Sequence, residues 1–231
     1  MATKQAASAS TPRSGRSTAN GSPNGASKGA ATTGSNGSAT TTGNRFTVPG
    51  VSRSDGALAA RTLQSRLIAL IDLSLTLKHI HWNVVGPDFI GVHQMLDPQV
   101  DGVLAMIDET AERIATLGGN PNGLPGNLVA ERSWDDYELG RALVAEHLGA
   151  LDVVYAGVIE AHRAAIDQLE DPDIVTQDIL VGQAATLEKY QWFVRAHLES
   201  ASGALSTGGA STELTAARKA KAGASRANAG R

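Results

Sequence analysis

The sequence predicts an all-α protein, in which one four-helix bundle between residues 51 and 202 is flanked by two disordered tails. Nearly all apolar residues of the 231-residue chain lie in that window, and they recur there at the spacing of amphipathic helices. Residues 1–50 and 203–231 are instead rich in Ser, Thr, Gly, Ala and Asn. Such segments bury too little apolar surface to offset the entropy of ordering them.

Capping and helix-breaking residues divide the domain into four long helices. Their expected ranges are about 54–85, 88–118, 133–169 and 171–200, with Ser or Asp near the starts and Gly-Pro or Gly-Gly after the first two. The connection between the second and third helices contains one short helical turn around Leu128. Few strand signals occur, so the helices are expected to pack as a bundle.

The tails and the domain carry opposite charges. Residues 1–50 hold five basic and no acidic residues, and residues 203–231 hold five basic residues against one acidic. Because the whole chain has a formal net charge of -3, the domain itself carries about -12. This asymmetry predicts cations as partners of the domain and a polyanion as the partner of the tails.

The chain has no cysteine, so any metal must be bound by His, Asp, Glu or carbonyl oxygen. No apolar run approaches the roughly 20 residues needed to cross a bilayer, and the N-terminus lacks the apolar segment of a secretory signal. We expect no membrane partner and a cytoplasmic setting, although the Ser-rich, acid-free N-terminal segment also resembles a transit peptide.

Histidines near the end of the first helix differ in direction. On a helical projection His81 lies within about 40° of the leucines that face the bundle. His79 lies about 200° away from His81 and so points to another side. A lone histidine on an apolar face is more often a satisfied core residue than a metal ligand. His81 is therefore informative only together with the second helix.

Four side chains that can bind metal form a stripe along the second helix. With His93 as zero on a helical projection, the next three project at about 40°, 60° and 100°, in the order in which they follow along the chain. They lie at the edge of the apolar face, whereas Glu109 points away at about 160°. The stripe consists of His93, Asp97, Asp108 and Glu112. Each residue taken singly is also compatible with a solvated acidic edge or an interface ion pair.

Axial spacing prevents one chain from completing a site. Asp97 and Asp108 are about 16 Å apart along the helix, far more than bonds of roughly 2 Å to one metal allow. Two copies of the second helix, packed antiparallel about a two-fold axis, would bring the His93 end of one to the Glu112 end of the other. His81 would join from the first helix. Imidazole and carboxylate ligands favour iron(II), manganese or zinc. Pro98 within this helix removes a backbone donor and could re-aim Asp97.

The stretch HWNVVGPDFIGVHQMLDPQVDGVLAMIDETAERIATLGG resembles the signature of the Dps family, the dodecameric ferritin-like miniferritins of bacteria. The resemblance implies a ferritin-like bundle, a homododecamer, and oxidation of iron(II), with hydrogen peroxide preferred over oxygen, ahead of ferric iron storage. It also places iron at the dimer interface, as Fe(II)/Fe(III), and implies Trp82 beside it as an electron donor, with a packed core tryptophan as the alternative. The implied ferroxidase ligands are His81, His93, Asp97, Asp108 and Glu112.

Acidic residues surround the junction between the third and fourth helices. In similar shells such acids line three-fold pores that draw cations inward. Ordinary capping and first-turn acids explain some of them equally well. The pore candidates are Asp167, Glu170, Asp171 and Asp178, beside Asp173.

Basic residues in the flexible tails are expected to bind double-stranded DNA non-specifically and to lose it as salt rises. The C-terminal stretch ARKAKAGASR resembles the basic tails of some Dps proteins, whereas the N-terminal tail is equally compatible with a solubilising extension. The candidates are Arg218, Lys219, Lys221, Arg226, Arg231, Lys4, Arg13 and Arg16.

The leading hypothesis is an iron-oxidising, iron-storing enzyme of the nucleoid that protects DNA under oxidative stress. One alternative is a DNA-compacting structural nucleoid protein with little or no ferroxidase activity, in which the interface site is vestigial or holds static zinc. Another is a miniferritin whose tails bind nothing.

Overall fold

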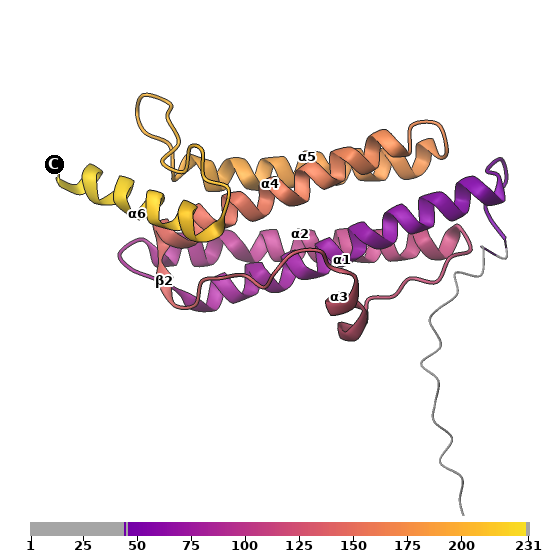
Figure 1. The fold of residues 1–231 in the computed structure, drawn as a ribbon, viewed down its shortest axis with the longest axis horizontal. Coiled ribbons are helices and arrows are strands. Elements are labelled where there is room, and N and C mark those ends of the chain that lie inside the picture. The colour runs from indigo at the N-terminus through magenta and orange to yellow at the C-terminus, as the bar shows by residue number, and fades with distance from the viewer. Residues whose placement is uncertain (1–43, 45, 230–231) are drawn as a thin grey trace, which may run out of the picture. The chain divides into compact units, whose positions relative to one another are not determined.

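The computed structural model describes residue 44 and residues 46–229. The predicted all-α bundle is confirmed, since α1, α2, α4 and α5 pack side by side (Figure 1). The short extra helix α3 is confirmed as well. The elements are α1 (Arg53–Asn83), β1 (Val84–Val85), α2 (Phe89–Thr116), α3 (Pro125–Glu131), β2 (Ala142–Leu143), α4 (Val144–Gln168), α5 (Ile174–Ala196) and α6 (Glu213–Ala229). None of the described helices is long and apolar enough to cross a membrane.

The ends of α1 and α2 follow local capping chemistry. Ser52, rather than the predicted Ser54 or Asp55, caps α1: its Oγ accepts a hydrogen bond from the Asp55 amide at 3.1 Å. After α2, Gly118 adopts φ +80°, a conformation that favours glycine and ends the helix as predicted. A Cβ at Gly118 would also overlap the Phe46 carbonyl, so the glycine lets the incoming chain pass close by.

The prediction that the third helix starts near residue 133 is wrong, because α4 begins only at Val144. Strands β1 and β2 pair in parallel, which places the start of α4 beside the end of α1. The connection from α2 must therefore run back along α1. Residues 117–131, including α3, cover the first part of that path, and residues 132–143, which form no helix, cover the rest from Asp72 to the paired strands.

Trp134 secures this connection to α1. Its Nε1 donates a hydrogen bond to Asp72 at 2.8 Å, and Arg132 forms an ion pair with the same carboxylate at 3.3 Å. The segment is thus held along the outside of α1 by side chains, not by helical hydrogen bonds. Helix periodicity in the sequence does not report such contacts.

The C-terminal region corrects a second prediction, that residues 203–231 form a disordered tail. Residues 213–229 form α6, which packs on α4. Ala216, Ala217 and Ala220 are each at most 4% exposed in that contact. Gly149 of α4 permits the close approach, because a Cβ there would lie 2.7 Å from the Ala216 carbonyl oxygen. The predicted N-terminal tail, 1–50, lies mostly outside the described residues.

Apolar side chains of α1 and α2 fix the backbone around the histidines. Leu77 and Ile80 precede His81 on α1 and are fully buried, as are Val92 and Leu96 on α2. All four belong to one core cluster that also includes residues of α4 and α5. The backbone next to the candidate site is therefore held by the main core.

Candidate metal centre

His81 and His93 face each other across the turn between α1 and α2. Their rings stack with centroids 3.6 Å apart at 25°. The Nδ1 of His81 lies 3.0 Å from the His93 carbonyl oxygen, and the Nδ1 of His93 lies 2.9 Å from the His81 carbonyl oxygen. Because a carbonyl only accepts, each Nδ1 carries the proton, and each Nε2 keeps a lone pair for a metal. Two backbone carbonyls thus select the tautomer that binds metal.

Asp97 joins the two histidines, one helical turn after His93. Its Oδ1 lies 3.4 Å from His81 Nδ1 and accepts a hydrogen bond from Lys78 Nζ at 2.9 Å. That hydrogen bond from Lys78, with smaller contributions from the charges of His81 and His93, lowers the pKa of Asp97 below its usual value. Asp97 is therefore an ionised carboxylate with a replaceable lysine partner. His81, His93 and Asp97 thus lie together at the α1–α2 turn, and this group is called the half-site below.

Asp108 and Glu112 do not reach this half-site. Both lie on the exposed face of α2, and their carboxylates have no hydrogen-bond or ion-pair partner within residues 46–229. In the same part of the chain, no three His, Cys, Asp or Glu side chains are close enough to hold a metal ion. The structure thus brings together His81, His93 and Asp97 and leaves the acidic pair about 16 Å further along α2.

Large apolar side chains near the half-site are exposed. Trp82 is 73% exposed, so within a single chain it is not a packed core residue. Phe89 and Ile90, at the start of α2, are 40% and 52% exposed. Exposed apolar residues in one region favour a surface that a partner covers.

The acidic residues at the α4–α5 junction separate into two kinds. Asp173 is buried, bound to Arg113 at 2.7 Å and to the Thr176 hydroxyl. Burial alone would raise the pKa of Asp173, but the hydrogen bonds from Thr176 and Arg113 outweigh it and lower that pKa. Asp173, not the predicted Asp171, also precedes α5 as its N-cap. The four pore candidates, by contrast, are all exposed: Asp167, Glu170, Asp171 and Asp178.

The described basic candidates lie on the exposed side of α6, opposite its buried alanines. Lys219 donates to the Gly208 carbonyl at 2.8 Å, and Lys221 forms an ion pair with Glu146 at 3.0 Å. Arg218 and Arg226 have no ion-pair partner among the described residues. The remaining candidates lie outside the described residues: Arg231, Lys4, Arg13 and Arg16.

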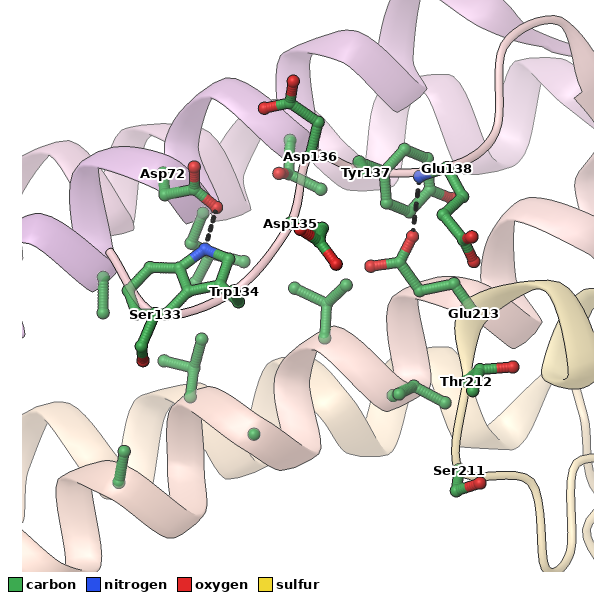
Figure 2. A pocket seen from close by; sticks show the side chains of 18 of the residues that line it. Asp72, Ser133, Trp134, Asp135, Asp136, Tyr137, Glu138, Ser211, Thr212 and Glu213 are labelled. Carbon is green, nitrogen blue, oxygen red and sulfur yellow. Dashed lines mark hydrogen bonds between the residues drawn. The ribbon is translucent and has the colours of Figure 1, made fainter. Parts of the chain in front are cut away.

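A second group of polar residues lies across α1, and the sequence did not indicate it. His79 Nε2 donates to the Leu139 carbonyl at 2.7 Å, and Tyr137 is hydrogen-bonded to His147 at 3.0 Å. Beside them a cavity of about 610 Å³, with Trp134 and Glu213 in its lining, opens between α1, α4 and the extended connection (Figure 2). These residues come from α1, the connection and α4, so no periodic spacing could have revealed the group.

Comparison with known proteins agrees with this architecture. A family model, the ferritin-like domain, matches residues 60–203, so the chain is a ferritin-like protein. The DNA protection during starvation protein of Mycolicibacterium smegmatis is 57% identical, over 76% of this chain and 96% of that protein. Because the match covers nearly the whole relative at this identity, the chain belongs to the Dps family.

Solved structures of Dps proteins are similar to this chain in both sequence and fold. DpsA14 from Streptomyces coelicolor is 60% identical, with a TM-score of 0.70 over 71% of this chain and 97% of that one. Mycobacterium smegmatis Dps is 57% identical, with a TM-score of 0.71 over 72% of this chain and 95% of that one. The family predicted from the sequence is therefore confirmed.

Proposed function

We propose that this protein oxidises iron(II) with hydrogen peroxide at sites shared between two chains and stores the ferric product inside a dodecameric shell. Membership of the ferritin-like Dps family supports iron as the substrate. The observation that carries the proposal is the half-site itself: backbone carbonyls face the Nδ1 atoms of His81 and His93, which leaves their Nε2 lone pairs for a metal, and the Asp97 carboxylate lies 3.4 Å from His81 Nδ1. Asp108 and Glu112 of the two-fold mate would supply the missing ligands.

Each residue of the half-site has a definable part in this reaction. The neutral imidazoles bind iron(II) without a charge penalty, and the carboxylates neutralise the iron(III) that forms. Asp97 exchanges Lys78 for the metal, which costs little because the ion pair is exposed to solvent. Trp82, next to His81, would lie under the partner chain and could donate an electron there.

Mixing two inactive variants tests the sharing of the site. His81→Ala with His93→Ala removes the imidazole half, and Asp108→Ala with Glu112→Ala removes the acidic half. Each variant alone should assemble but leave iron(II) and peroxide unreacted, as followed by ferric absorbance. After co-refolding, a mixed dimer regains one of its two sites, so random mixing restores about one quarter of all sites. Activity that stays absent in the mixture would show that the halves do not meet.

We further propose non-specific binding and protection of double-stranded DNA through the basic residues of α6 and of the N-terminal segment, and hence an association with the nucleoid. The name of the Mycolicibacterium smegmatis relative, DNA protection during starvation protein, supports this role. Many weak phosphate contacts on one shell add to firm binding. The acids at the α4–α5 junction are proposed to guide iron(II) inward where three chains meet. A shell that binds DNA but leaves iron(II) unoxidised would favour the purely structural alternative.

A further inference from the structure

Tyr137 and His147 form a hydrogen-bonded pair where the extended connection meets α4. The Tyr137 hydroxyl oxygen lies 3.0 Å from His147 Nδ1, and the two rings are nearly parallel, at 13°. His147 is fully buried, and its Nε2 has no hydrogen-bond partner within residues 46–229. Tyr137 lines the cavity shown in Figure 2, near Glu213. A half-buried phenol thus contacts a fully buried base.

The direction of this hydrogen bond depends on which nitrogen of His147 carries the proton. Burial raises the pKa of Tyr137 and lowers the pKa of His147, so both side chains are neutral near pH 7. The carbonyls of Asn83 and Gly140 raise the pKa of His147 partly back. With the proton on Nε2, the Nδ1 lone pair accepts the hydroxyl proton of Tyr137. The pair is arranged for proton transfer from phenol to imidazole.

A phenol that loses one electron becomes a strong acid, so its oxidation is easy only where a base takes the proton at once. The chain has three tyrosines. Tyr155 donates to Gln99 Oε1 at 2.7 Å, and Tyr190 donates to the Pro98 carbonyl at 3.4 Å. Amide oxygens are far too weakly basic to accept that proton. Tyr137 is therefore the one tyrosine with a proton acceptor in place.

Tyr137 also lies close to the half-site without touching it. Its ring meets His79 edge-on, with centroids 5.8 Å apart, and His79 holds the connection against α1 through the Leu139 carbonyl. His79 and His81 project to opposite sides of α1, so about one helix diameter, roughly 10 Å, separates Tyr137 from the histidine pair. An electron crosses such a distance readily, whereas a phenol oxygen cannot bind the iron across it.

We propose that Tyr137 is a redox residue that supplies an electron to the iron site while His147 holds its proton. This inference rests on the proposed iron oxidation. One iron(II) reduces hydrogen peroxide to hydroxide and a hydroxyl radical and becomes iron(III). Tyr137 then gives one electron to the radical, which becomes a second hydroxide, and the phenolic proton moves to His147 Nδ1. A second iron(II) reduces the phenoxyl radical, and the proton returns to its oxygen.

Two iron(II) ions and one hydrogen peroxide thus yield two iron(III) ions and two hydroxides, and no hydroxyl radical leaves the site. Nearby negative charge assists both the loss of the electron from Tyr137 and the uptake of the proton by His147. The charge of Glu213 raises the pKa of Tyr137; the charge of Glu146 raises the pKa of His147, against the larger opposing effect of His79. Both carboxylates favour electron loss from the ring and the imidazolium that follows.

Rapid-freeze electron paramagnetic resonance of the full-length shell, loaded with iron(II) and mixed with peroxide, tests this role of Tyr137. The wild type should give a radical whose hyperfine pattern changes when tyrosine is ring-deuterated, which separates it from a Trp82 radical. The signal should be lost in Tyr137→Phe and kept in Tyr155→Phe and Tyr190→Phe. His147→Asn, whose side-chain oxygen accepts the hydrogen bond but not the proton, should lose the signal while iron(II) is still oxidised.

The possible failures are distinguishable. A wild-type shell that leaves iron(II) unoxidised overturns the proposed function and this inference with it. Iron oxidation without a tyrosine-derived radical, or with one that survives in Tyr137→Phe, overturns the role of Tyr137 alone. Should Tyr137→Phe fail to assemble, the double variant Tyr155→Phe with Tyr190→Phe leaves Tyr137 as the sole tyrosine. A tyrosine signal there supports the proposal, and its absence refutes it.

Discussion

Replacing Gly149 with leucine should release α6 from the bundle while the bundle itself stays folded. Even a single Cβ at this position would lie 2.7 Å from the Ala216 carbonyl oxygen and 2.8 Å from Ala220 Cβ, and leucine adds three more carbons. The neighbours of Gly149 on α4, Leu148 and Leu151, are fully buried in the main core, so α4 cannot retreat. The strain must therefore be relieved by α6.

The free energy that holds α6 in place is small enough for this to happen. Burial of the three alanine methyl groups contributes about 2–3 kcal/mol. The hydrogen bond from Thr207 to Asp152, which secures the preceding loop, adds about 1 kcal/mol. Forcing a leucine into a filled contact costs as much or more. A 17-residue helix that loses its packing is at best marginally stable alone.

Amide hydrogen exchange followed by mass spectrometry measures the outcome. In Gly149→Leu, peptides covering 213–229 should exchange at nearly unprotected rates, while peptides of α1 and α2 keep their protection. Gly157→Leu is the matched control, because a Cβ at Gly157, also on α4, meets nothing within 4 Å. Unchanged protection of 213–229 in Gly149→Leu would refute the assignment of this contact as the one that docks α6.

Three further outcomes are expected. The double variant Arg218→Gln with Arg226→Gln should weaken retardation of duplex DNA in low salt. The slope of the log binding constant against log salt concentration should become less steep by about 0.9 for each phosphate that is no longer neutralised. Equal slopes in wild type and variant would remove α6 from the DNA interface. Lys78→Met should tighten iron(II) binding in calorimetry, because Asp97 no longer has a competing cation, and weaker binding would instead make Lys78 part of the site. Asp173→Asn should destabilise the fold by about 3 kcal/mol at neutral pH, since Arg113 is left buried and unpaired. Because the folded-state pKa of Asp173 is lowered, its stabilisation is present above pH 3.8 and disappears as pH falls below it; a stability difference between wild type and Asp173→Asn that persists at low pH in urea unfolding would contradict this.

The sequence predicted the parts of the fold that depend on local signals. Gly118 ended the second helix where expected, and helical periodicity predicted that His81 faces the bundle. The start of α4 was missed because it depends on the reach required of the connection and on Trp134 contacting Asp72, neither of which has a period. Helix α6 was missed because its apolar stripe consists of alanines, which also characterise a flexible tail.

The same division holds for the candidate site. One helical turn separates His93 from Asp97, so their proximity follows from the sequence alone. Lys78 as the partner of Asp97, and Tyr137 beside His147, depend on tertiary packing between distant segments, which spacing along one helix cannot report. The acidic half, Asp108 and Glu112, was predicted to act in another chain, and that stays a prediction.

Anomalous diffraction at the iron edge, from crystals of the full-length protein soaked in iron(II), tests the central claim most directly. The account predicts metal within about 2.0–2.2 Å of the Nε2 atoms of His81 and His93 of one chain and of the carboxylates of Asp108 and Glu112 of its two-fold mate. Iron bound wholly within one chain, or an acidic pair directed away from the neighbouring histidines, would contradict it.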